Sequence, residues 1–376
     1  MKVAFVSTNS NSTPPLAYGG ESYFWEIAKN VALNGHDVTL YATGGSETPP
    51  GGRLKLIGAD SMFAQTFQPK GYEFIVQKSN KDIMVIKDYL NDFLEADIVH
   101  DCSHEHYVSK YLRDFCGKTN SINTLNGNCW IYPQPPFNMV VGSKTWLNNA
   151  LNGFNGWEGT PYEKDYQNMW IGNKLKDARM IYWGTDTDFY CPSDYKKDDY
   201  ILFFSRFHIM KGVMTAINLA KKMGFKLILA GSTDIADHII YAKQAFEAIK
   251  GWRNIEFVNI PKDSRHHECK VELYRKARAL LFPIQTAEPF GMVVTEALAC
   301  GTPVIATKLG AMDEIIQDGI TGYTVPLNGN FEQAIKDIDK IDPRNGVMDT
   351  RQRFDTKKLA KEYIKLYHKV IDGERW

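Results

Sequence analysis

Between residues 200 and 307, short apolar runs alternate with segments suited to helices. The apolar runs are Tyr200–Ser205, Lys226–Ala230, Ile255–Ile260, Ala279–Pro283 and Val304–Thr307. Helix-competent segments separate them, at 212–223, 239–249, 268–276 and 292–300. Strands that alternate with helices in this way form a parallel sheet with helices on both faces, and such sheets bind ligands at the carboxyl ends of their strands. This half of the chain is therefore predicted to be a doubly wound α/β domain.

The first 190 residues repeat this rhythm less clearly. Strands are expected at 2–7, 36–42, 97–100 and 121–125, and a helix at 22–34. A chain of 376 residues exceeds what one core usually serves. We therefore expect two Rossmann-like domains facing a cleft, 1–190 and 195–355, separated by the polar, proline-bearing link 191–199. A closing helix is predicted at 356–372.

Charge and cysteine content narrow the class of protein. The formal net charge is zero, so no global basic field indicates a nucleic-acid partner. Residues 1–190 carry a net charge of −4 and the remainder +4, which makes the C-terminal half the better phosphate binder. The 6 cysteines show no CxxC pair and no zinc-ligand spacing, as expected of reduced thiols in a cytoplasmic protein. No apolar stretch has the length of a signal peptide or a membrane-spanning helix.

The segment 288–306 places two glutamates around a glycine that opens a predicted helix. Pro289 suits a first helical turn, and Gly291 lets a ligand approach the backbone. The free N–H groups at this N-terminus would hold an anion such as phosphate. If the helix includes Glu288 and Glu296, they lie roughly 12 Å apart along its axis, which suits a ligand with hydroxyls at both ends and phosphate between them. An amphipathic helix with two solvated glutamates is the alternative.

Two cations follow the predicted strand 200–205. Arg206 comes directly after the strand, and Lys211 opens the next predicted helix. Cations at a strand end that faces a helix N-terminus would neutralise a diphosphate, whereas solvated surface cations are the ordinary alternative. In the first strand-to-helix turn, Gly19 and Gly20 allow the backbone to approach a phosphate or sugar, although paired glycines also occur in simple turns.

Two further segments have more than one interpretation. Residues 97–106 contain three histidines and three acids, which fit a zinc site, a histidine that hydrogen-bonds a sugar hydroxyl, or an ordinary surface loop. Residues 126–190 are rich in aromatic side chains, which suit carbohydrate faces in an acceptor subsite and suit core packing equally well.

Together these motifs resemble the retaining GT-B glycosyltransferases of family 4, the group 1 type. The matching residues are Gly19–Gly20, Asp97–His100, Arg206, Lys211–Gly212 and Glu288-x7-Glu296 followed by Gly301–Ala306. The resemblance covers nearly the whole chain and is most specific in the C-terminal half. It implies an N-terminal acceptor domain, a C-terminal donor domain and a last helix, 356–376, that crosses back to the first domain. It also implies transfer of a hexose from a nucleoside diphosphate sugar to a hydroxyl acceptor with retention of configuration, without a metal or other cofactor.

The resemblance implies four residues that act at the reaction centre. Arg206 and Lys211 would bind the donor diphosphate and stabilise its charge as the leaving group. Glu288 would orient the hydroxyls of the donor sugar, and His100 would approach that sugar from the first domain. No carboxylate in the matched motifs is an obvious nucleophile, so the implied reaction is a same-face, ion-pair-like displacement.

The remaining donor contacts would come from backbone groups and from a second carboxylate. Glu296 would bind the ribose, and the backbone at Val258 and Ile260 would meet the base. The loop residues expected to approach the donor through their backbone are Gly19, Gly20, Gly291, Met292 and Val293.

Four departures from the family pattern lie in or next to the acceptor side. They are Cys102 in place of a second histidine, Asn126 in place of another histidine, Trp183-Gly184-Thr185-Asp186 in place of Asn-Gly-Val-Asp, and Ser22 in place of a glutamate. His104 would replace the missing histidine, and Asn126 and Trp130 are also expected on the acceptor side. The acceptor stays open among a glycan, a lipid-linked sugar and a small molecule. The resemblance makes peripheral membrane contact possible, since many relatives use lipid acceptors, but the net negative first half does not indicate it.

Two other functions fit the same resemblance. A GT-B epimerase or hydrolase would act on the sugar nucleotide without an acceptor. A partner subunit without catalysis would keep the fold for binding, but we would expect it to have lost residues of the diphosphate site. In this chain Arg206, Lys211, Glu288 and Glu296 are all intact.

Overall fold

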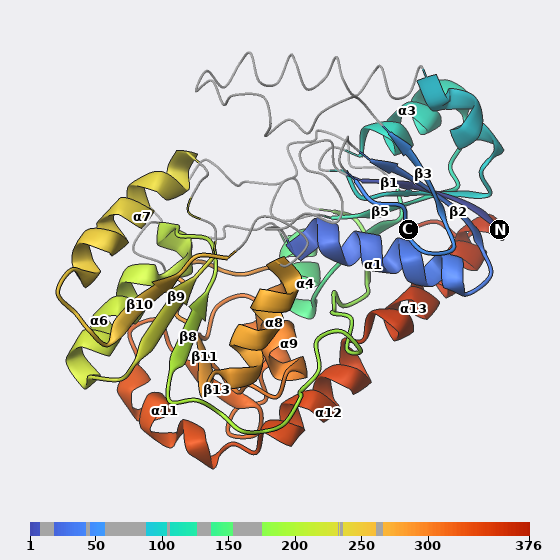
Figure 1. The fold of residues 1–376 in the computed structure, drawn as a ribbon. Helices are drawn as coiled ribbons and strands as arrows, with labels where there is room; N and C mark the ends of the chain where they lie inside the picture. Colours follow the sequence, from blue (N-terminus) through green and yellow to red (C-terminus); the bar gives the residue numbers. More distant parts are fainter. Residues whose placement is uncertain are drawn as a thin grey trace. The chain divides into compact units, whose positions relative to one another are not determined.

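The computed structural model describes residues 1–7, 19–42, 46–56, 88–103, 106–125, 137–152, 175–231, 233, 236–260 and 266–376. These residues form two compact α/β units, each with its own parallel sheet (Figure 1). Unit 1 contains the described residues of 1–154, residues 175–183 and Thr356–Trp376, and unit 2 contains residues 184–355. The predicted class, with two parallel-sheet α/β domains, is confirmed.

The described strands of unit 1 run in the order β3-β2-β1-β4-β5-β6-β7, and every pair is parallel. These strands are β1 (Lys2–Val6), β2 (Asp37–Ala42), β3 (Arg53–Leu56), β4 (Ile98–Asp101), β5 (Ser121–Thr124), β6 (Met139–Val141) and β7 (Arg179–Met180). The helices are α1 (Gly19–Leu33), α3 (Tyr107–Cys116), α4 (Lys144–Asn152) and α13 (Thr356–Ile371), with a further helical segment at 88–95. A parallel sheet is normally covered on both faces, which explains why β1 and β4 are apolar runs.

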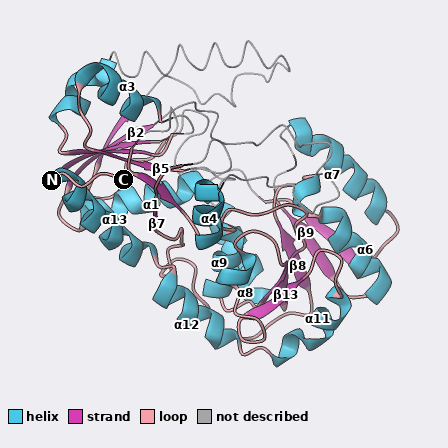
Figure 2. Ribbon diagram, turned by 180° about the vertical axis from the view of Figure 1, so that it is seen from behind, coloured by secondary structure: helices cyan, strands magenta, loops and turns pink. Residues whose placement is uncertain are grey.

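Helices cover both faces of this sheet. On one face, Ala4, Val6 and Val99 pack with Phe93 from the helical segment 88–95 and with Leu112 from α3. On the other, α13 contacts β4 and β5 and packs along α1, which lies beside it in both views (Figure 2). The C-terminal helix is thus part of the core of unit 1.

The described strands of unit 2 run in the order β10-β9-β8-β11-β12-β13, again all parallel. They are β8 (Ile201–Phe204), β9 (Leu227–Ala230), β10 (Ile255–Val258), β11 (Ala279–Phe282), β12 (Val304–Thr307) and β13 (Gly322–Val325). The helices are α6 (Val213–Met223), α7 (Ala236–Ile249), α8 (His266–Lys276), α9 (Met292–Ala299), α10 (Met312–Ile315), α11 (Phe331–Asp337) and α12 (Pro343–Arg353), with short 3-10 turns η2 (Ile209–Lys211) and η3 (Ile338–Lys340). Across the described parts of both units, no helix is long and apolar enough to cross a membrane.

Successive residues of β8 pack on opposite faces of the second sheet, as strand geometry requires. Ile201 and Phe203 join a core cluster with α6, α7 and α11. Phe204 packs on Tyr274 of α8 with ring centroids 5.5 Å apart. Both faces are therefore buried, and functional side chains are expected at the strand ends.

In each unit the strand order reverses next to the first strand. β1 lies between β2 and β4, and β8 lies between β9 and β11. The connections on the two sides of such a reversal run to opposite faces of the sheet, so a crevice opens at the carboxyl ends of the two central strands. In unit 2 this point lies after Phe204 and Phe282, and it is the position where the topology alone predicts a ligand site.

Candidate active site

A largely buried ion pair lies at the strand-order reversal of unit 2. Lys211 ends η2, which follows β8, and Glu288 lies between β11 and α9. The Lys211 Nζ donates to Oε2 of Glu288, and only 11% and 17% of the two side chains are exposed. Burial lowers the pKa of the Lys211 ammonium, the Glu288 carboxylate opposes this effect, and the nearby Arg206 lowers the pKa further. Arg206 and Lys211, the two predicted diphosphate ligands, are thus close enough to interact. Glu288, the predicted sugar ligand, contacts Lys211 directly.

Three loops at the carboxyl edge are packed against one another through their backbones. The N–H of Gln285, after β11, donates to the carbonyl of Met210 in η2 at 2.8 Å. The N–H of Ala311, after β12, donates to the carbonyl of Glu288 at 2.9 Å. Gly310 has a φ of +62°, and a Cβ atom there would lie 2.2 Å from the Glu288 carbonyl oxygen. Only glycine fits at position 310, and its close packing fixes the backbone of Glu288.

The helix after Glu288 begins at Met292, in agreement with the predicted segment 292–300, and does not include the first turn expected at Pro289. Gly291 has a φ of +88°, a left-handed conformation, and α9 begins at Met292. Pro289 and Glu288 therefore lie outside the helix, so the condition for a separation of roughly 12 Å between the two glutamates along one helix axis is not met. The N–H of Val294 donates to the carbonyl of Gly291 at 2.9 Å, whereas the N–H groups of Met292 and Val293 come before the first intrahelical acceptor, so they keep their predicted availability to an anion.

The second glutamate of the motif is held by two side chains of α8. Glu296 is only 4% exposed. The Lys270 Nζ donates to its Oε1 at 2.7 Å, and the Tyr274 hydroxyl donates to its Oε2 at 3.0 Å. Burial, followed by the Glu296 charge, raises the pKa of Tyr274 well above its ordinary value. Glu296 is thus oriented on both of its oxygens.

The other predicted donor contacts lie on separate elements of the two units. Val258 is the last residue of β10, and Ile260 follows it as a buried side chain. Gly19 and Gly20 are the first two residues of α1 in unit 1. The structure describes these backbones, and their contact with a donor stays a prediction.

His100 belongs to the core of unit 1. It is fully buried in β4, and its Nδ1 and Nε2 lie 2.8 Å from the Tyr367 hydroxyl and 2.7 Å from Thr124 Oγ1. Its ring also packs on Phe5, with centroids 4.6 Å apart. Both ring nitrogens are engaged, so this position does not support the predicted contact with a donor sugar. Two tyrosines of α13 that flank the ring, Tyr363 and Tyr367, explain the burial.

We expect the stability of unit 1 to fall as the pH is lowered below 6.5. Burial, helped by His106, lowers the pKa of His100 from 6.5 to about 3. Between these values the unfolded chain binds a proton at this histidine and the folded chain does not, so stability falls by about 1.4 kcal/mol per pH unit. In urea unfolding, wild type should lose about 2 kcal/mol more than His100→Gln between pH 7 and pH 5. Equal losses in the two proteins would contradict this account.

The predicted acceptor-side residues are mostly outside the described part of the chain. His104, Asn126 and Trp130 all lie there, so their roles stay predictions. Cys102, in the position of the missing histidine, is a fully buried free thiol. Among the described residues, no cluster of three or more His, Cys, Asp or Glu side chains could hold a metal ion.

Some aromatic residues of the segment 126–190 pack in the core. Trp146 is 2% exposed. Trp183 stacks on Tyr23, with ring centroids 5.7 Å apart, and meets Phe24 edge-on at the same distance. For these residues, the core-packing interpretation holds.

Sequence reasoning missed three residues that hold the two glutamates. Lys270 and Tyr274 are four residues apart on α8 and so share one helical face. That spacing is visible in the sequence, but nothing in it shows that this face packs on Glu296. Gly310 follows β12 closely, and only its contact with the Glu288 backbone reveals its importance.

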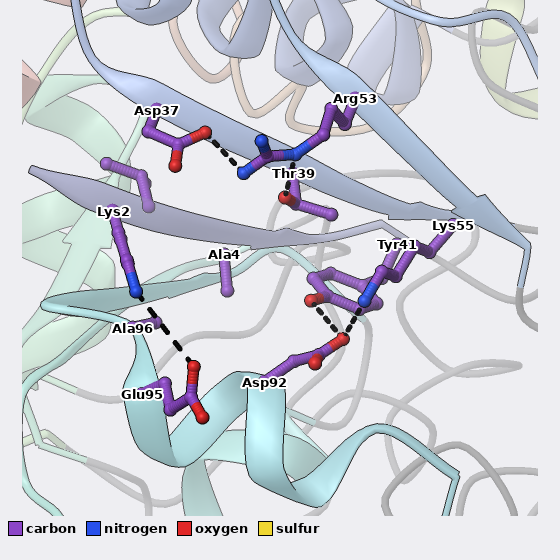
Figure 3. A pocket seen from close by; sticks show the side chains of 11 residues that line it. Lys2, Ala4, Asp37, Thr39, Tyr41, Arg53, Lys55, Asp92, Glu95 and Ala96 are labelled. Atoms are coloured by element: carbon purple, nitrogen blue, oxygen red, sulfur yellow. Dashed lines mark hydrogen bonds and ion pairs between the residues drawn. The ribbon is translucent and has the colours of Figure 1, made fainter.

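A hollow of about 180 Å³ lies on the sheet of unit 1, and none of the predicted site residues lines it. It is lined by three cations and three carboxylates from β1, β2, β3 and the 88–96 segment (Figure 3). The charges pair as Arg53–Asp37, Lys55–Asp92 and Lys2–Glu95, and all six side chains are at least one-third exposed. Because the pairs neutralise one another in solvent, this hollow has no excess charge for an ionic ligand.

Solved structures define the class of protein. Sucrose-phosphate synthase from Thermosynechococcus elongatus matches over 100% of both chains with a TM-score of 0.73 and 20% sequence identity. The Anabaena protein HepE, solved in complex with UDP-glucose, covers 97% of this chain and 99% of its own, with a TM-score of 0.67 and 15% identity. The protein therefore has the GT-B fold.

Sequence comparison then gives the family. Residues 191–358 match the family described as "Glycosyl transferases group 1". An uncharacterised glycosyltransferase of Methanocaldococcus jannaschii is 23% identical over 98% of both chains. Residues 191–358 thus match the group 1 glycosyltransferases, as the motifs of the C-terminal half indicate.

Proposed function

We propose that the protein transfers a hexose from a nucleoside diphosphate sugar to a hydroxyl acceptor with retention of configuration. Unit 2 would bind the donor, and unit 1 would supply the acceptor site. The neighbour whose solved complex contains UDP-glucose supports a nucleotide sugar as donor. The acceptor is a glycan, a lipid-linked sugar or a small molecule.

The observation that carries this proposal is the buried Lys211–Glu288 pair at the carboxyl edge of the second sheet. The pair contains one of the two predicted diphosphate cations, and the other, Arg206, is close enough for its charge to lower the Lys211 pKa. The N-terminus of α9 adds N–H groups that suit phosphate oxygens. A diphosphate beside Lys211 would thus bring its attached sugar close to the carboxylate of Glu288.

These groups would act mainly on the leaving group. As the bond between sugar and diphosphate breaks, negative charge grows on the phosphate, and preorganised cations stabilise that charge without reorganisation. Arg206 and Lys211 would supply this stabilisation, so no metal is required in this proposal. Glu288, already paired with Lys211, would accept hydrogen bonds from sugar hydroxyls and so orient the ring.

Retention would then follow from attack on the face that the diphosphate leaves. The departing phosphate oxygen would take the proton of the acceptor hydroxyl, while the acceptor oxygen bonds to the anomeric carbon. His100 has no part in this step, because both of its ring nitrogens are bonded within the core of unit 1.

A sugar-nucleotide epimerase or hydrolase is the second candidate, because the same donor site would serve it. Incubation with a labelled donor and no acceptor separates the two functions. A transferase leaves most of the donor intact, whereas a hydrolase or epimerase converts it.

Nucleotide binding is expected to raise the melting temperature. A ligand present at 100 times its Kd stabilises the folded state by about 2.7 kcal/mol, which corresponds to about 5–10 °C for a unit of this size. UDP, ADP, GDP and their glucose conjugates should be compared in a thermal-shift assay. We expect one base to be preferred, and a flat response to all six compounds would refute a nucleotide-sugar site.

A further inference from the structure

The Lys270 ammonium lies in a site built from one carboxylate and two aromatic rings. Its Nζ is 2.7 Å from each oxygen of Glu296. It also lies 5.6 Å from the ring centre of Tyr190 and 5.3 Å from that of Phe204. The side chain is 12% exposed. Both the carboxylate and the ring faces attract an ammonium group.

The Lys270 ammonium lies next to the proposed donor site. Phe204 ends β8, two residues before Arg206. Glu296 lies on α9, four residues after the helix start at Met292. Lys270 is thus connected by direct contacts to the two segments that carry the proposed phosphate ligands.

Lys270 keeps hydrogen-bonding capacity beyond the Glu296 carboxylate. An ammonium has three N–H donors. Glu296 provides the oxygen atoms within hydrogen-bonding distance of Lys270 in the described part of the chain, and the rings accept no conventional hydrogen bond. The Glu296 carboxylate has about four lone-pair directions, and the hydrogen bonds from Lys270 and Tyr274 occupy only some of them. Together the two residues can offer an acceptor and a donor side by side.

A ribose cis-diol matches that pair, because each hydroxyl is both a donor and an acceptor. We propose that Lys270 is a specificity-determining residue that, together with Glu296, selects the ribose diol of the donor nucleotide. Glu296 accepts hydrogen bonds from the hydroxyl groups, and Lys270 donates to a hydroxyl oxygen. This inference rests on the proposed function of the site, and it adds a residue outside the E-x7-E motif to ribose recognition.

A different result is expected if Lys270 has only a structural role. If Lys270 only neutralises the buried Glu296, its loss would lower stability and weaken every nucleotide by the same factor. If Lys270 also contacts the diol, its loss would weaken ribonucleotides and leave deoxyribonucleotides nearly unchanged. The ratio of the two affinities separates these roles, because a uniform loss cancels in it.

The test measures that ratio by titration calorimetry. UDP, ADP and GDP are compared with their 2′-deoxy and 3′-deoxy forms on the wild type, Lys270→Met and Lys222→Met. We expect the wild type to prefer at least one ribonucleotide over a deoxy form by about 10-fold or more, the scale of a hydrogen bond to a charged group. In Lys270→Met the preference should fall below about 3-fold. Lys222 is a matched control, because it is 68% exposed and pairs with Glu332.

An unchanged preference in Lys270→Met, with all affinities weakened equally, would overturn the inference. Circular dichroism and thermal unfolding show whether that variant folds. If it does not, Lys270→Gln replaces it, since glutamine keeps a donor without the charge and should retain an intermediate preference. Absence of binding by any nucleotide to the wild type would instead refute the proposed function, so the two failures are distinguishable.

Discussion

Replacement of Lys211 by alanine is expected to reduce the rate of sugar transfer at least ~100-fold, the scale for removal of one preorganised electrostatic group. The loss should appear in kcat, because the charge that Lys211 stabilises grows as the diphosphate leaves. The variant also leaves Glu288 without its cation in a site where both side chains are largely buried. That uncompensated carboxylate would repel the diphosphate and add to the effect.

The double variant Lys211→Ala/Glu288→Gln separates the two causes. If the activity depends on the cation, removal of the extra negative charge should restore little of it. The exposed pair Lys222–Glu332 provides the control, and Lys222→Ala should remain within about 2-fold of the wild type, as is typical of surface ion pairs. Steady-state kinetics with the preferred nucleotide sugar measures all four proteins. Near-wild-type turnover by Lys211→Ala would remove Lys211 from the proposed reaction centre.

The second large effect is expected at Gly310. Its replacement by alanine should destabilise unit 2 by about 3 kcal/mol or more, because the Cβ clashes with backbone that cannot move independently. That Cβ would lie 2.2 Å from the carbonyl oxygen of Glu288 and 2.3 Å from its nitrogen. Relief of the clash displaces Glu288 itself, so residual activity per folded molecule should also fall.

Gly319 provides a matched control in the same unit. Its φ is +73°, close to the +62° of Gly310, but nothing lies within 4 Å of the position of its Cβ. Gly319→Ala should therefore cost about 1 kcal/mol, which is the conformational penalty alone. Denaturant unfolding of the two variants separates backbone strain from the clash. Similar losses at both positions would show that contact with Glu288 is unimportant.

The sequence predicted most elements of unit 2 well. The predicted strand 304–307 matches β12, and the predicted helix 212–223 differs from α6 by one residue. This success has a physical cause. Strands buried on both faces are short continuous apolar runs, and glycines such as Gly224 end the helices between them in a left-handed conformation.

The failures arise where tertiary contacts decide the outcome. The first turn expected at Pro289 is replaced by a loop, because Gly291 adopts a left-handed conformation and the backbone of Glu288 bonds to the loop after β12. His100, at the end of the predicted strand 97–100, was predicted to contact the donor sugar. Its partner Tyr367 is 267 residues away in the chain, so no local pattern could indicate its burial.

The site itself was predictable only in part. Lys211 and Glu288 could be paired from the expected positions of two strand ends, since neighbouring parallel strands end at one edge. The support given to Glu296 by Lys270 and Tyr274 depends on the rotation of α8 about its own axis, which the weak amphipathic pattern of that segment does not determine.

The position of α13 has a consequence for synthesis on the ribosome. Its tyrosines Tyr363 and Tyr367 complete the core around His100, yet they are translated after the whole of residues 184–355. The described strands of unit 1 therefore emerge first but lack an essential part of their packing until α13 leaves the exit tunnel. The described strands of unit 2 all lie between residues 184 and 355, so they emerge before α13. The half of the protein that is made first is thus expected to be the half that finishes folding last.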